Sequence, residues 1–264
     1  MGSNPFLLQA TREFYHCFVL PRSGGRDITM NKKKIVQYFT FIIGGVLLCA
    51  IVAGVLNGLI GKGEWNLGWT NYRYDDSAYQ VGEGTIAAPN LERIDLDWID
   101  GNITVVICQD AYISVTETTP AELTEKTRIH WLVSGDGKSL SIKYRGSSSF
   151  FGGTKDKNKN LILRIPEKLM GQLQTLNINA VSSNVTVSNI IIDNIDVKTT
   201  SGNINLELPE ATAFTLTHES RRDDKPNIDF LSVTQEGNTY VSGTDGIHIN
   251  VKTNSGKVSI KSTK

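Results

Sequence analysis

Cysteine is scarce in this sequence. Three cysteines occur in 264 residues, at positions 17, 49 and 108, and only Cys108 lies beyond residue 60. An internal disulfide is therefore excluded from the C-terminal three-quarters of the chain, which packing and hydrogen bonds must hold together. We expect Cys108, within the apolar run Val-Val-Ile-Cys, to be a small buried strand residue and not a reactive thiol.

The sequence also lacks the residue patterns of common catalytic and metal-binding sites. Its four histidines, at positions 16, 130, 218 and 248, are far apart, and none has a cysteine or a second histidine at ligand spacing. This spacing argues against a zinc site. The nucleophile motif Gly-x-Ser-x-Gly is absent. We therefore predict no catalytic, cofactor-binding or metal-binding residues, and we do not expect an enzyme.

Three aspartates, Asp95, Asp97 and Asp100, offer the carboxylates that a calcium site needs. No glutamate follows to close a twelve-residue calcium loop. The alternation of apolar and polar residues also places the first two on the outer face of a strand. We expect these aspartates to be surface residues.

Net charge is zero over the whole chain, but it is divided unevenly. Residues 1–60 hold six Lys/Arg against two Asp/Glu, which leaves 21 against 25 for residues 61–264. The mildly acidic larger part has no basic stripe, which argues against a nucleic-acid partner. Its sign also favours cationic partners over anionic ones.

A long apolar run occupies residues 35–60, which contain no charged side chain. About 20 residues suffice for a helix to cross a bilayer, so we predict one transmembrane helix here. Lys32, Lys33 and Lys34 precede the run and place the N-terminus in the cytoplasm by the positive-inside rule. The run is longer than the core of a cleaved signal peptide, and Val46-Leu-Leu-Cys49 lacks the small residue that lipidation needs, so we expect an uncleaved anchor.

Four segments follow from this prediction. Residues 1–34 form a cytoplasmic leader, 35–60 the transmembrane helix, 61–80 a partly ordered linker and 81–264 an ectodomain in the cell envelope. Residues 1–29 are unlike the rest, and Met30 directly precedes an asparagine and three lysines. We hypothesise that Met30 is the native start and that residues 1–29 are not native. A disulfide-free ectodomain suits a bacterial envelope.

A twelve-residue unit recurs in the ectodomain: apolar-x-apolar, a polar turn and apolar-x-apolar again. Clear copies begin at residues 94, 176, 195 and 249, and glycine occupies the turn in three of them, at positions 101, 202 and 256. Glycine tolerates the positive φ of a tight corner, and Ser183 replaces it in the remaining copy. Short alternating runs of this kind predict β-strands.

Weaker copies begin at Phe214 and Leu231, so the unit starts are 19, 19, 17 and 18 residues apart from position 176 onward. This near-constant period predicts an all-β solenoid, single-stranded and β-helix-like, in which the coils stack in chain order. The alternative is a β-hairpin in each unit, which gives a meander or sandwich. We interpret Arg221–Pro226 as a solvated loop and not a binding site. The solenoid predicts one inward apolar column of Ile178, Val197, Leu216, Val233 and Val251.

The units Thr-Thr-Ser-Gly-Asn-Ile-Asn-Leu206 and Thr-Asn-Ser-Gly-Lys-Val-Ser-Ile260 resemble the repeats of the bacterial "putative adhesin" family of β-strand-repeat proteins. This is a domain family of unknown function in Gram-positive envelope proteins, and the resemblance covers about residues 90–262. It implies a right-handed β-solenoid, a cell-surface location and, in some relatives, a link to envelope-stress operons. It supplies no catalytic residues. Ser182-Ser183 and the copies at 214 and 231 depart from the repeat.

Three functions follow as hypotheses. The first is a membrane-anchored, non-catalytic adhesion, ligand-binding or scaffolding module whose partner is an envelope protein, peptide or glycan. The second is a regulatory or sensor module of an envelope-stress response. The third is a polysaccharide-active β-helix enzyme, which would need carboxylates clustered on adjacent coils.

Overall fold

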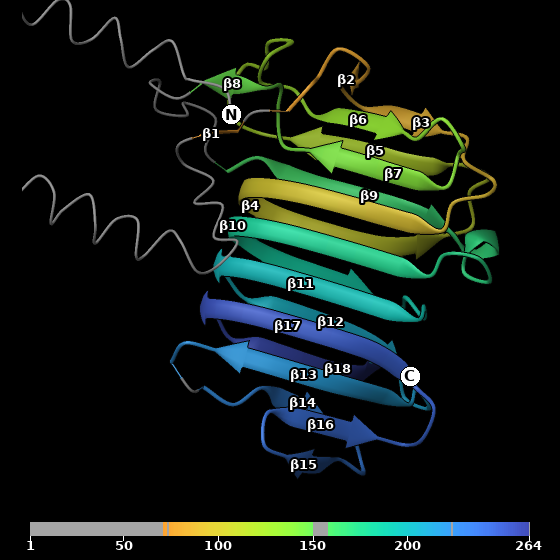
Figure 1. Ribbon diagram of the computed structural model, residues 1–264, viewed down its shortest axis with the longest axis vertical. Coiled ribbons are helices and arrows are strands. Elements are labelled where there is room, and N and C mark those ends of the chain that lie inside the picture. The colour runs from red at the N-terminus through yellow and green to blue at the C-terminus, as the bar shows by residue number, and fades with distance from the viewer. Residues whose placement is uncertain (1–70, 73, 150–157, 223, 264) are drawn as a thin grey trace, which may run out of the picture. The chain divides into compact units, whose positions relative to one another are not determined.

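The computed structural model describes residues 71–72, 74–149, 158–222 and 224–263. They form an all-β domain, as predicted, with one short 3₁₀ helix, η1 (Glu167–Leu169) (Figure 1). The strands are β1 (Asn71–Tyr72), β2 (Gln80–Val81), β3 (Gly84–Ile86), β4 (Arg93–Cys108), β5 (Ile113–Thr118), β6 (His130–Val133), β7 (Ser139–Lys143), β8 (Ser148–Ser149), β9 (Asn160–Pro166), β10 (Thr175–Ser188), β11 (Asn194–Ser201), β12 (Ile204–Pro209), β13 (Phe214–Ser220), β14 (Asn227–Asp229), β15 (Thr234–Glu236), β16 (Thr239–Ser242), β17 (Ile247–Ser255) and β18 (Val258–Thr263).

The predicted leader and transmembrane helix, residues 1–60, lie outside the described residues, as do residues 61–70 of the predicted linker. Within the part of the chain that the structure describes, no helix is long and apolar enough to span a bilayer. The end of the predicted linker contains β1 and the first residue of β2, so it belongs to the folded domain.

The central strands form coils with a strand in each of two layers and a corner between them (Figure 1). The first half of β4 pairs with β7 and its second half with β9, and β10 pairs in the same way with β11 and β12. Because β11 and β12 follow one another but do not pair, the unit is a coil and not a hairpin. All neighbouring coils pair in parallel.

The order of the coils differs from their order in the chain. Along the stack it is β7/β9, β4, β10, β11/β12, β17/β18 and β13/β14. The predicted stacking in chain order is therefore wrong at the C-terminal end, where the β13/β14 coil lies outside the later β17/β18 coil, although the parallel coils agree with the solenoid interpretation. The unit predicted at Leu231 is not a coil, because its β15 pairs antiparallel with β16 and Leu231 is 94 % exposed.

Adjacent coils pack closely at their corners. A Cβ on Gly202 would lie 2.0 Å from the Ser183 carbonyl oxygen, and a Cβ on Gly256 would lie 1.8 Å from that of Gly202. Glycine has no Cβ and so avoids these overlaps, whereas the β10 coil has Ser183 at its corner. The coil of β13 and β14 has no glycine at its corner and lies outside β17/β18, where its corner meets one neighbouring coil instead of two.

The predicted inward column is correct for three of its five members. Ile178, Val197 and Val251 are in register on neighbouring strands, but the next residue along is His218. Leu216 pairs with Ile249 instead and belongs to the adjacent column. Inward residues are almost completely buried along the stack, as the alternating burial of β10 shows, and each buried aliphatic side chain contributes about 1.5–3 kcal/mol of hydrophobic stabilisation.

Antiparallel strands close both ends of the stack. At one end β5 pairs with β9 and β6 pairs with β7, while β2 and β3 form the outermost edges. At the other end β16 pairs with β13, and β15 forms the edge. Edge strands of only two or three residues offer little backbone for pairing with a second chain. The N-terminal end of the stack is thus capped by antiparallel strands that pair with β7 and β9.

Candidate functional site

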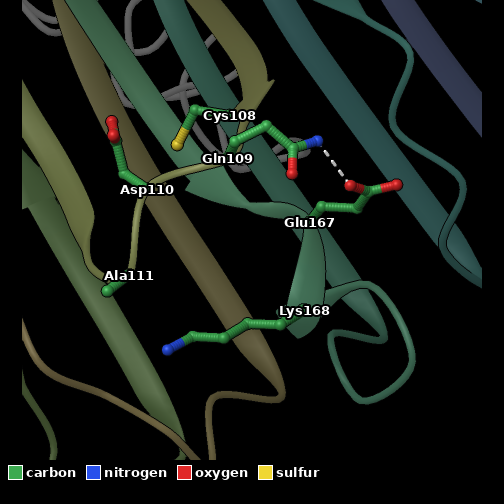
Figure 2. A pocket seen from close by; sticks show the side chains of 6 residues that line it. All are labelled: Cys108, Gln109, Asp110, Ala111, Glu167 and Lys168. Atoms are coloured by element: carbon green, nitrogen blue, oxygen red, sulfur yellow. Dashed lines mark hydrogen bonds between the residues drawn. The ribbon is translucent and has the colours of Figure 1, made fainter.

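An open pocket of about 450 Å³ lies where β4 ends and η1 begins (Figure 2). Cys108 is half-buried here, at the last position of β4, so the prediction of a buried strand residue is correct only in part. The side-chain amide of Gln109 donates a 2.6 Å hydrogen bond to Glu167 Oε2 across the pocket. The Lys168 ammonium lies 5.9 Å from the ring centroid of Tyr112. Among the described residues, no hydrogen bond or ion pair links the Cys108 thiol to a base.

A buried ion pair lies inside the stack, near the end formed by β5 and β6. Lys159 Nζ is 2.8 Å from Glu117 Oε2, and the two side chains are 0 % and 2 % exposed. Lys159 Nζ also donates to the backbone carbonyl oxygens of Thr127 and Tyr144. Both Glu117 carboxylate oxygens accept from the Ile129 N–H at 3.0 Å. Every ammonium hydrogen thus has an oxygen acceptor, which is the condition for a stable buried charge.

Aromatic rings enclose this ion pair. Lys159 Nζ lies 4.3 Å from the ring centroid of Tyr144 and 5.2 Å from that of Trp98, distances at which cation–π attraction operates. The Trp98 indole N–H donates to the Lys159 carbonyl oxygen at 2.8 Å. Because the pair is enclosed and its ammonium is hydrogen-bonded on three sides, it belongs to the interior of the domain and has no surface that a substrate could reach.

On the outer face of β4 and β10, polar side chains form hydrogen bonds between neighbouring coils. Asn177 donates to Asp95 at 2.7 Å and Asn179 donates to Asp97 at 3.0 Å. Burial alone would raise the pKa of Asp95, but hydrogen bonds from Arg93 and Asn177 lower it overall. Asp95 and Asp97 lie half-buried on the outer face of β4, and each accepts from a different asparagine.

A second row of amides follows the aligned corners. We call Asn160, Asn102, Asn184 and Asn203 the amide ridge. Asn102 donates to Asn160 Oδ1 at 2.8 Å, and Asn184 donates to Asn102 Oδ1 at 3.1 Å. The Asn203 backbone N–H donates to Asn184 Oδ1, and the Lys257 N–H donates to Asn203 Oδ1. In the sequence, Asn102, Asn184 and Asn203 occupy the position after the corner glycine or its serine equivalent, whereas Asn160 follows Lys159, and nothing there indicates their hydrogen bonding.

Tyrosines from the predicted linker cover the outer face at the β6/β7 end. The Tyr74 hydroxyl donates to the Arg145 carbonyl oxygen at 2.7 Å, and the Tyr79 hydroxyl donates to Ser141 Oγ at 3.0 Å. Tyr72 is more deeply enclosed, and burial raises the pKa of its phenol well above the ordinary value. Residues 71–79 therefore fasten the start of the domain to its first coil.

Parallel coils, polar outer faces and glycine corners together define a β-strand-repeat domain. Residues 91–264 match the family model Toastrack DUF4097, a domain of unknown function. The chain belongs to this family, which confirms the resemblance seen in the repeats. Among curated proteins, none matches the chain.

One solved structure has a similar fold. It is described as a "putative cell adhesion protein" from Clostridium sporogenes, with a TM-score of 0.50 and 14 % sequence identity. The similarity covers 70 % of this chain and all of the other chain. At this level of identity the match supports the fold and not the function.

Proposed function

We propose that this protein is a membrane-anchored, cell-surface β-repeat module that binds a ligand or scaffolds other components of a bacterial envelope and catalyses no reaction. The observation that carries the proposal is the fixed polar surface of the stack. Side chains on neighbouring coils are in register and hydrogen-bonded to each other, as for Asn250 and Asp196 at 2.9 Å. A surface ordered before binding loses little conformational entropy when a ligand binds.

Two further observations support binding over catalysis. The Cys108 pocket is open, no base is hydrogen-bonded to its thiol among the residues that the structure describes, and the Lys159–Glu117 pair is enclosed. The family membership and the fold shared with a described adhesion protein are consistent with a surface role. Membrane attachment rests on the uncharged run of residues 35–60 and on the three lysines before it.

Binding can be tested with residues 66–264, which form one compact unit. We expect this fragment to sediment with purified cell envelopes and to be released by excess unlabelled fragment. A matched variant, Asn177→Ala with Asn179→Ala, removes two amides from the outer face without touching the core. Failure of the wild-type fragment to bind any envelope fraction would contradict the proposal.

Attachment and orientation need a separate test. In intact cells from which the wall has been removed, we expect an added protease to degrade the C-terminal domain and leave a fragment that contains residues 35–60 in the membrane. Replacement of Lys32, Lys33 and Lys34 with glutamine should reduce the fraction with the domain outside. Recovery of the intact protein in the soluble fraction would refute the anchor.

A further inference from the structure

The amide ridge is a linear surface along one edge of the domain. Three of its four asparagines, Asn102, Asn184 and Asn203, are exposed, and Asn160 is half-buried. Because strands in a sheet are about 4.8 Å apart, the ridge from Asn160 to Lys257 is about 19 Å long. A surface of this shape fits an extended chain better than a small compact molecule.

The ridge offers hydrogen-bond donors to a ligand and few acceptors. All four side-chain oxygens already accept a hydrogen bond along the ridge. Each amide nitrogen carries two hydrogens, and Asn102 and Asn184 each use one of them within the ridge. Asn160 makes a longer contact of 3.5 Å to Thr118 Oγ1, and Asn203 Nδ2 has no partner among the described residues. The free N–H groups select a ligand rich in acceptor oxygens.

Basic residues continue the ridge at its β17/β18 end. We call Arg221, Arg222, Lys225 and Lys257 the basic corner, and all four are exposed. The Arg221 N–H donates to the Thr253 carbonyl oxygen at 3.2 Å, which holds the start of this loop against the neighbouring coil. Asn227 of β14 pairs with Ser259 of β18, and Lys225 and Lys257 each lie two residues before this pair. The loop that we predicted to be only solvated therefore adjoins the ridge.

Acidic residues reduce the charge of the basic corner without reversing it. Asp224 is exposed in the same loop, and Asp223 adds a second carboxylate in sequence, although it lies outside the described residues. Nearby, Glu219 forms a 2.8 Å ion pair with Lys252, so these two charges offset each other. Four basic against two acidic side chains leave a local positive excess, opposite in sign to the average for residues 61–264.

We propose that the amide ridge and the basic corner together bind one linear polymer that carries phosphate groups. This inference rests on the proposed function and names the ligand class for one edge of the domain. Phosphate oxygens accept hydrogen bonds from amide N–H groups, and two adjacent arginines can contact phosphate in bidentate geometry. The polymer meets neutral donors along the amide ridge and positive charge at the basic corner. Attraction to the basic corner determines where the polymer binds, and the row of donors determines the direction in which it runs.

The test uses the full chain in nanodiscs of uncharged phosphatidylcholine and fluorescently labelled inorganic polyphosphate as the probe. We expect saturable binding that weakens with salt, because polyanions release counterions when cationic side chains replace them. Replacement of all four basic-corner residues with glutamine should weaken binding at least about tenfold and reduce the slope of log K against log salt by about 3.

A matched variant controls for total charge. Lys126, Arg128, Lys138 and Lys168 are exposed outside the basic corner, and their replacement with glutamine changes the net charge by the same amount. We expect this variant to retain most of the affinity for polyphosphate. Equal losses from the two quadruple variants would show that total charge governs binding and would overturn the assigned site.

A single isosteric change tests the ridge itself. In Asn203→Asp, a carboxylate oxygen still accepts the Lys257 N–H, so the corner keeps its hydrogen bond, while two N–H donors are replaced by negative charge. We expect about threefold to tenfold weaker polyphosphate binding with an unchanged unfolding temperature. Unchanged affinity would remove the ridge from the binding site.

Two outcomes separate this inference from the proposed function. If envelopes bind the protein but polyphosphate neither binds nor competes, the phosphate-polymer inference fails and the surface-binding function stands. If vesicles containing phosphatidylglycerol bind the basic corner while polyphosphate does not, the occupant is an anionic membrane and the inference is likewise overturned. If neither envelopes nor polyphosphate bind, both proposals fail.

Discussion

The two ends of the stack close the same apolar core with different chemistry. At the β5/β6 end a charged pair, Lys159 and Glu117, is buried among aromatic rings and saturated with hydrogen bonds. At the β13/β16 end the inward column finishes with His218, and Phe230 packs edge-to-face on Phe214 at 5.0 Å. The first end depends on complete pairing of charges, whereas the second depends on a neutral imidazole and on aromatic packing.

Because of this difference, we expect different changes to destabilise the two ends. A buried charge without its partner carries a large desolvation cost, so the first end should respond sharply to the loss of either ionic side chain. A neutral buried histidine becomes unfavourable when it is protonated, so the second end should respond to pH. Variants at one end can therefore be compared with variants at the other by their free energies of unfolding.

The largest effect is expected from breaking the buried ion pair. In Glu117→Leu, the Lys159 ammonium remains buried without its carboxylate, and we expect a loss of about 3–5 kcal/mol in the free energy of unfolding. Urea unfolding followed by tryptophan fluorescence measures it. The double variant Glu117→Leu with Lys159→Met should recover most of this loss, since no unpaired charge remains. A double variant as unstable as the sum of the two single variants would mean that packing, not charge burial, makes the pair necessary.

A smaller effect is expected at the opposite end. Phe230 is half-buried against Phe214, and Phe230→Ala should cost about 1–3 kcal/mol through lost packing and ring contact. The neighbouring Leu231 is 94 % exposed, so Leu231→Ala serves as the matched control and should change stability by less than about 0.5 kcal/mol. Equal effects of the two substitutions in urea unfolding would show that Phe230 does not close the core.

The next prediction concerns pH and again separates the two ends. Burial lowers the pKa of His218 below its ordinary value of 6.5, while the nearby Asp224 carboxylate opposes this shift. Above pH 6.5 the imidazole is neutral in both states. Below 6.5 the unfolded chain binds a proton that the folded domain resists, so the free energy of unfolding should fall.

The measurement is urea unfolding of wild type and His218→Gln between pH 7.5 and pH 5. Carboxylates contribute to both proteins, so the quantity of interest is the difference between the two pH profiles. We expect the wild type to lose more stability than the variant over this range, by an amount that depends on how far the pKa is lowered. Parallel profiles would assign the pH dependence to other groups and leave no special role for the imidazole.

Part of this contrast could be predicted from the sequence. Glu117 follows Ile113 and Val115 at inward spacing, and His218 follows Phe214 and Leu216 in the same way. A polar residue in an inward position of a strand must find a partner or remain neutral. The pattern therefore indicates two buried polar groups, but it does not identify Lys159, which lies just before β9, far from Glu117 in the sequence.

The strand order was the part that the sequence did not predict. Units at 195, 214 and 249 have nearly the same apolar pattern, so periodicity alone favours stacking in chain order. One difference between these units is the corner, since Gly256 packs directly against Gly202 while the β13/β14 coil has no corner glycine. Contacts of this kind join residues far apart in the chain, and periodicity does not reveal them.

The smallest effects are expected from exposed ion pairs, one near each end. Lys138 pairs with Glu92 at 2.6 Å on one side of the stack, and Lys252 pairs with Glu219 at 2.8 Å on the other. Water and salt screen both pairs, so Lys252→Gln should cost less than about 1 kcal/mol. Lys138→Gln should be indistinguishable from a neutral surface change, and both effects should shrink further in 1 M salt.

These surface variants test whether the two ends differ because of their buried groups. If the contrast arises from buried groups, removing an exposed pair at either end must leave the urea midpoint nearly unchanged, and the Glu117 and His218 variants must carry the difference. A large, salt-dependent loss at only one of the two exposed pairs would instead locate the asymmetry in surface charge. In that case we expect the larger loss at the Lys252–Glu219 pair beside the basic corner, since charge is concentrated there.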